Sequence, residues 1–176
     1  MAGHLTWDHA VQDIPEAGLS VTRQAAPEEL AALAAALDLV ALNSLSATYS
    51  ITAIGAGRYR LGGRLNAAVL QACVVTLEPV TSMIEETLEA TFWPEPDIPP
   101  PASGELDLDE ELEPEPIVAG QIDVGRIAVE CLAAAIDPFP RKADAALDRA
   151  SAGPSGSAAD VSDHPFAALA RIKEKD

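Results

Sequence analysis

Strict two-residue alternation over residues 45–53 is the feature that most constrains the fold of this chain. In LSATYSITA every odd-numbered residue is apolar and every even-numbered residue is serine or threonine, which is the period of a strand with one buried face. The GAG at 55–57 is a turn, and a register centred on it sets Ile51 opposite Leu61. The same register sets Thr52 opposite Arg60 on the other face. Apolar residues therefore match on one face and polar residues on the other, which predicts a β-hairpin.

A third strand is predicted at 80–92, VTSMIEETLEATF. Ile84, Leu88 and Phe92 have one parity, and polar residues lie between them. Pro79 suits the start of this strand, where it removes no ladder hydrogen bond. The stretch CVVTLEP, residues 73–79, is then the connection between strands two and three.

Two helices complete the predicted fold, which is α+β. One covers 27–38, with Pro27 at its first position, and the other covers 123–136, with Asp123 as its N-cap. We expect both on one face of an antiparallel β-sheet of three or more strands joined by meander hairpins. We expect five segments in this order: the N-terminal helix and sheet (1–93), a flexible acidic loop (94–120), the second helix (121–150), a linker (151–163) and a short C-terminal helix (164–176).

Negative charge is concentrated in one part of the sequence. The chain carries a formal charge of −17, and residues 85–116 contain 12 acidic residues with no lysine or arginine. This charge opposes unspecific binding to nucleic acid or to an anionic membrane, and it favours basic partners. The acidic loop is either a solvated, disordered spacer or a docking segment that uses Leu106, Leu108 and Leu112 as apolar anchors.

Arg58, Arg60 and Arg64 have the same strand parity and form a short positive stripe on the solvent face. One interpretation is contact with RNA phosphates. The other, which the net charge favours, is cross-strand pairing with Glu85 and Glu89.

A second basic spot is FPRK, residues 139–142, at the end of the second helix. Arg141 and Lys142 either complement the helix dipole or add to an RNA contact.

The two cysteines, Cys73 and Cys131, bear on the question of catalysis. A zinc site needs about four ligands at loop spacing, and the three histidines do not pair with the cysteines in such a pattern. The acidic residues beside Cys73 should raise the pKa of its thiol, which opposes nucleophilic catalysis. We therefore expect two small buried thiols and no cofactor. The alternative is a metal- or thiol-dependent enzyme or regulator, which requires the two sulfurs to lie together.

Four segments occur in an order that resembles the YceD family of bacterial and plastid proteins. They are QACVVTLEPV, the acidic loop, the helix IDVGRIAVECLAAAIDPFPR and the terminal HPFAALARIK, and the resemblance extends from about residue 20 onward. The family has a Cys-x-x-Cys-Leu-x-Pro corner. Cys73 matches its first cysteine, Thr76 stands at the second, and Leu77, Glu78 and Pro79 match the remainder. The chain thus resembles a divergent branch in which this corner is structural.

The resemblance implies a function in ribosome biogenesis. Further family positions fall on Glu130, Pro138, Pro140, Arg141, Pro165, Phe166 and Leu169. The family is required for accumulation of large-subunit ribosomal RNA, so we expect a non-enzymatic factor that binds this RNA or a basic ribosomal protein or assembly factor. No signal sequence or membrane-spanning run is apparent, and we expect a cytoplasmic monomer that does not contact membranes.

Overall fold

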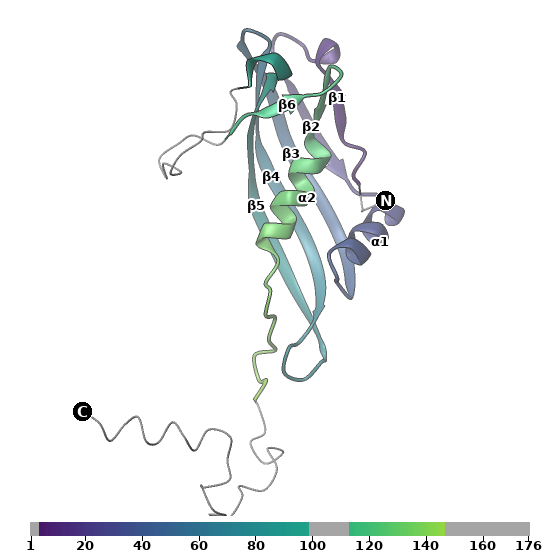
Figure 1. Ribbon diagram of the computed structural model, residues 1–176. Coiled ribbons are helices and arrows are strands. Elements are labelled where there is room, and N and C mark those ends of the chain that lie inside the picture. Colours follow the sequence, from purple (N-terminus) through teal and green to yellow (C-terminus); the bar gives the residue numbers. More distant parts are fainter. Residues whose placement is uncertain (1–3, 99–112, 147–176) are drawn as a thin grey trace, which may run out of the picture. The chain divides into compact units, whose positions relative to one another are not determined.

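The long alternating segments form the centre of a five-stranded β-sheet (Figure 1). The computed structural model describes residues 4–98 and 113–146. The elements are β1 (Asp8–Ala10), η1 (Val11–Asp13), β2 (Leu19–Gln24), α1 (Pro27–Ala36), β3 (Ala41–Gly55), β4 (Arg58–Ala72), β5 (Pro79–Pro94), η2 (Glu95–Asp97), β6 (Glu115–Ile117), β7 (Gln121–Asp123) and α2 (Val124–Ala135). The strand order is β2-β3-β4-β5-β6, and β1 and β7 form a separate two-stranded sheet.

The predicted hairpin register is confirmed. Ile51 lies opposite Leu61 and Thr52 opposite Arg60 in the antiparallel β3–β4 pair. The turn between them consists of Ala56 and Gly57, whose φ angles are 52° and 71°. Two consecutive left-handed residues give a turn whose twist matches that of the strands it joins. β5 then pairs antiparallel with β4, as the third alternating segment predicted.

β6 is an element that the sequence analysis missed. It lies inside the range expected to be a flexible loop and pairs in parallel with the end of β5, where Phe92 is opposite Glu115. Composition suggested a loop because Glu115 and Pro116 disfavour a strand interior. In the structure Ile117 packs against the core and Arg126 of α2 binds the Glu115 carboxylate. Tertiary contacts therefore stabilise a strand of only three residues.

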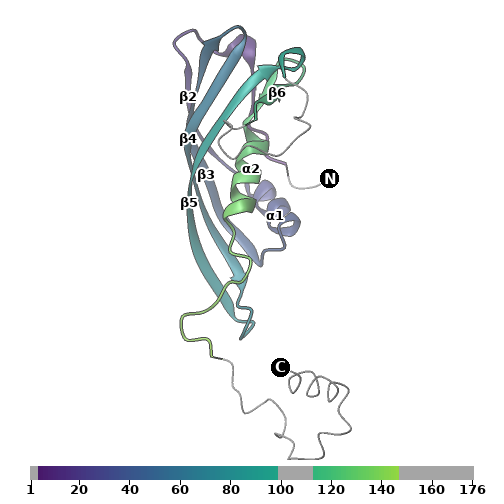
Figure 2. The same cartoon turned by 60° about the vertical axis from the view of Figure 1, so that its left-hand side comes forward.

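Both helices lie on the same face of the sheet, as expected (Figure 2). α1 begins at Pro27, and the carboxylate of Glu29 accepts a hydrogen bond from the amide of Ala26 at 2.8 Å. α2 begins after Asp123, whose side chain accepts a hydrogen bond from the amide of Arg126 at 2.8 Å. The N-cap predicted at Asp123 is confirmed.

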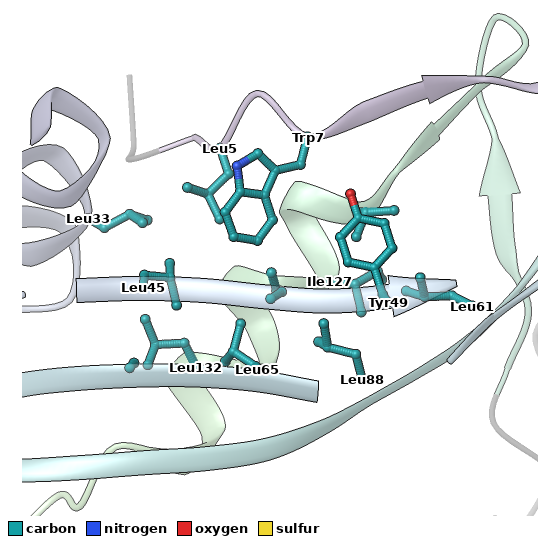
Figure 3. Close-up of a cluster of buried hydrophobic side chains, with 14 of the residues drawn as sticks. Leu5, Trp7, Leu33, Leu45, Tyr49, Leu61, Leu65, Leu88, Ile127 and Leu132 are labelled. Atoms are coloured by element: carbon teal, nitrogen blue, oxygen red, sulfur yellow. The ribbon is translucent and has the colours of Figure 1, made fainter. Parts of the chain in front are cut away.

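The core lies between the sheet and the helices (Figure 3). Leu45, Leu65 and Leu88 project from the long strands, and Leu132 projects from α2. The N-terminal segment also contributes, because Leu5 and Trp7 are buried there.

The described residues give an α+β fold with a mostly antiparallel sheet, so the predicted fold class is confirmed. They show no helix long and apolar enough to cross a membrane. Residues up to 145 form one compact unit. The predicted linker (151–163), the C-terminal helix (164–176) and the leucines Leu106, Leu108 and Leu112 lie outside the described residues.

Candidate functional site

The corner between β4 and β5 is built around Cys73, which is fully buried. The Cys73 amide donates to the Glu78 carbonyl at 2.8 Å, and the Leu77 amide donates to the Cys73 carbonyl at 2.9 Å. Leu77 adopts φ 61°, an unusual backbone conformation for a leucine. Its side chain is 79 % exposed. Leu77 therefore stabilises the corner through its backbone and leaves an apolar side chain at the surface.

The segment after α2 closes the corner from the other side. The Val74 amide donates to the Pro140 carbonyl at 2.9 Å, and the ammonium of Lys142 lies 2.7 Å from a carboxylate oxygen of Glu78. One of the two interpretations of Lys142 was that it complements the dipole of the second helix. However, α2 ends at Ala135 and has no basic residue in its last turn. The structure instead places Lys142 against the corner.

The sulfur of Cys73 is an acceptor for several donors. The amides of Val75 and Thr76 both lie 3.4 Å from it, and the amide of Lys142 lies at 3.5 Å. The Thr76 hydroxyl and these amides lower the pKa of the Cys73 thiol from its ordinary value of 9.0 to about 6. The expectation of a raised pKa was wrong, because it counted nearby carboxylates and not the amides that contact the sulfur.

This donor set does not suit a metal ion. Zinc requires about four ligands, and the corner provides one sulfur with Thr76 in place of the second. Amide N–H groups that point at a sulfur stabilise its negative charge and cannot coordinate metal. Across 4–98 and 113–146 no group of three or more histidine, cysteine, aspartate or glutamate side chains could hold a metal ion.

Cys131 is on α2, away from the Cys73 corner. Its thiol lies 3.6 Å from the carbonyl oxygen of Thr87 in β5, and burial together with the charge of Glu86 raises its pKa. Thr87 is eight residues further along β5 than Pro79, which lies beside the Cys73 corner, and eight residues span about 26 Å of a strand. The two cysteines are therefore too far apart to share a metal or form a disulfide.

The predicted positive stripe lies on β4, but two of its three arginines are engaged. The Arg64 guanidinium is 2.6 Å from a carboxylate oxygen of Glu85, which was one of its two expected cross-strand partners. Arg58 lies 3.8 Å from the centre of the Trp93 ring and 3.9 Å from Asp97. No ion pair is found for Arg60 within the described part of the chain.

A group of acidic side chains lies beside α2, where the sequence analysis proposed no site. Arg126 binds Glu115 of β6 and lies 2.7 Å from Glu130, one turn further along its own helix. Glu130 was noted only as a family position. The spacing of Arg126 and Glu130 could have predicted their contact from the sequence, but the contact with Glu115 depends on the fold.

Comparison with known proteins finds a family match that covers the Cys73 corner. The sequence model of the family described as "Large ribosomal RNA subunit accumulation protein YceD" matches residues 61–173. This is 113 of 176 residues, so more than half of the chain is matched. The chain belongs to the YceD family. The matched residues include the Cys73 corner, β5, α2 and Lys142. No curated protein and no solved structure matches this YceD-family chain.

Proposed function

We propose that this protein is a cytoplasmic, non-enzymatic ribosome biogenesis factor needed for accumulation of large-subunit ribosomal RNA, and that it acts by binding a basic ribosomal protein or assembly factor. The observation that carries the proposal is the family match over residues 61–173, since the family description names this RNA. The mode of action is argued from charge.

Acidic surface favours a basic protein over RNA as the direct partner. The chain carries −17, and RNA is a polyanion. Three of the five cations considered for RNA contact already have carboxylate neighbours: Arg58, Arg64 and Lys142. Each would have to exchange its partner for a phosphate. RNA contact therefore rests on Arg60 and Arg141, which are too few to oppose the net charge.

The acidic segment 99–112 supplies further charge for a basic partner. It carries five carboxylates, and three leucines alternate with them, namely Leu106, Leu108 and Leu112. In our proposal the carboxylates attract the partner and the leucines contact its apolar side chains. Recognition of basic segments by acidic segments with apolar anchors follows ordinary interface physics.

Affinity capture of the tagged protein from growing cells tests this mode of action. We expect large-subunit proteins to co-purify and to remain bound after ribonuclease treatment of the capture. Binding through opposite charges should weaken as salt increases, because salt screens exposed charges. Loss of all ribosomal proteins on ribonuclease treatment would show that RNA is the direct partner.

Neutralising the acidic segment tests its part in capture. Replacing Glu105, Asp107 and Asp109 by Gln, Asn and Asn should reduce captured large-subunit protein. The matched control replaces Asp13, Glu16 and Glu28 by Asn, Gln and Gln, which removes the same charge elsewhere. Equal loss in both variants would show that only net charge matters.

A further inference from the structure

Within residues 4–98 and 113–146, β5 has an open edge over most of its length. It runs from Pro79 to Pro94, and only Phe92–Pro94 pair with β6. Successive residues of a strand direct their backbone groups to alternate edges. The Thr87 carbonyl accepts a hydrogen bond from the Cys131 thiol, which lies outside the β4–β5 ladder. Residues of the parity of Thr87 therefore present their backbone groups to the open edge, where a further strand can pair.

A hollow of about 220 Å³ lies between this edge and α2. Leu88 and Ala90 of β5 and Ile127 of α2 provide its apolar lining. Cys131 lines it as well, and its raised thiol pKa keeps the sulfur neutral. The hollow can thus take an apolar side chain from a strand bound along the edge.

The remaining lining is acidic. Glu89, Glu113, Glu115 and Glu130 border the hollow. Arg126 engages Glu115 and Glu130. Glu89 alternates with the buried residues of β5, so its side chain is beside the same edge but on the face of the sheet away from α2. No ion pair is found for Glu89 or Glu113 in the described residues, so these two carboxylates are available to basic side chains of a strand bound at the edge. The open edge of β5 therefore combines backbone groups that can pair with a strand, an apolar hollow, and carboxylates that have no ion pair in the described residues.

We propose that the open edge of β5 binds an extended, basic segment of a partner protein, which adds to the sheet as a further strand. Its backbone pairs with β5, one apolar side chain enters the hollow, and lysine or arginine side chains contact Glu89 and Glu113. Strand addition to an exposed edge is an established mode of peptide recognition. This inference rests on the proposed function, because it locates the basic partner on the described fold.

Charge complementarity selects this occupant over the others. RNA is a polyanion, and a second copy of the chain, at −17, would bring its own excess of carboxylates. The acidic segment 99–112 of the same chain would place like charges beside Glu89 and Glu113. An extended basic segment is the occupant that can both pair its backbone with β5 and form ion pairs with these carboxylates.

The test uses the full chain and two synthetic nine-residue peptides of alternating lysine and valine. One has ordinary amides, and the other is N-methylated at every residue, which keeps its charge and removes its backbone donors. Affinity is measured by calorimetry at low salt, and the amide signals of Thr87 and Glu89 are followed by NMR. We expect the ordinary peptide to bind about tenfold tighter and to shift these signals.

A groove variant locates the site. Glu89→Gln with Glu113→Gln should weaken binding of the ordinary peptide about fivefold. The control Asp13→Asn with Glu16→Gln removes the same charge from the connection leading into β2, at the other edge of the sheet, and should leave affinity nearly unchanged. Equal affinity of the two peptides would overturn strand addition, and equal loss in both variants would overturn the location.

These outcomes are separate from the proposed function. A groove variant that still captures large-subunit proteins from cells would place the partner elsewhere while leaving the biogenesis role intact. A wild-type protein that captures none would contradict the proposed mode of action, whatever the peptides show.

Discussion

The sulfur of Cys73 accepts hydrogen bonds from three backbone amides in the corner between β4 and β5. Its position in the connection between two predicted strands placed it in this corner, and the structure agrees. The lowered pKa could not be predicted, because it comes from the Thr76 hydroxyl and from backbone amides, one of which belongs to Lys142, 69 residues away. Sequence reasoning counts charged side chains, whereas the folded backbone decides which N–H groups reach a sulfur.

Substitution of Cys73 tests this account of the corner. Cys73→Ala removes the acceptor for three amides, so it should lower the melting temperature more than Cys73→Ser, which keeps an acceptor. The folded thiol has its pKa lowered to about 6 from 9.0, so its stabilising effect is present above pH 9 and is lost as pH falls toward 6. Thermal unfolding of the wild type should therefore show a stability increase from pH 6 to 9 that Cys73→Ser lacks. Identical pH profiles would contradict the hydrogen-bonded thiolate.

His9 should make the folded protein less stable at acidic pH, below about pH 6.5. Its Nε2 lies 2.7 Å from the Tyr49 hydroxyl, and burial, then the charge of Arg23, lowers its pKa below the ordinary 6.5. The unfolded chain then binds the proton more readily, so stability falls as pH drops below 6.5. His9→Gln, which does not titrate, should show a shallower loss of melting temperature between pH 6.5 and 5. A loss as steep as that of the wild type would assign the acid sensitivity to other groups.

Helices, strands and turns that depend on nearby residues could be predicted from the sequence, whereas strands that depend on distant residues could not. The register at Ile51 and the cap at Asp123 follow from alternation and from spacing within a few residues. β6 was missed because its stability comes from Arg126 and from packing, and neither is visible in three residues of sequence. The two-stranded β1–β7 sheet joins segments more than a hundred residues apart, so no local signal could pair them.

The start of α2 packs against the N-terminal segment at Gly125. A Cβ there would overlap the backbone carbonyl oxygen of Leu5, a buried residue. Gly125→Ala should therefore destabilise the protein by about 1–3 kcal/mol through overpacking. Thermal unfolding would show this as a drop of roughly 2–4 °C per kcal/mol for a chain of this size. Gly62→Ala is the control, since a Cβ at Gly62 meets no atom within 4 Å.

At the scale of the whole molecule, net charge and family membership bear most on which partner the protein binds. The concentration of carboxylates in 85–116 is read from sequence alone, and it favours a basic partner. The arrangement of Glu89 and Glu113 beside an open strand edge required the structure, because the contributing residues come from β5, α2 and the segment leading into β6. Sequence could therefore suggest the class of partner but not where it binds.

The ratio of large- to small-subunit ribosomal RNA in cells depleted of this protein tests its role in large-subunit RNA accumulation. We expect the ratio to fall on depletion and to be restored by the wild-type chain. The neutralised segment variant at Glu105, Asp107 and Asp109 should restore it less well than the matched control variant. An unchanged ratio after complete depletion would contradict a role in large-subunit RNA accumulation.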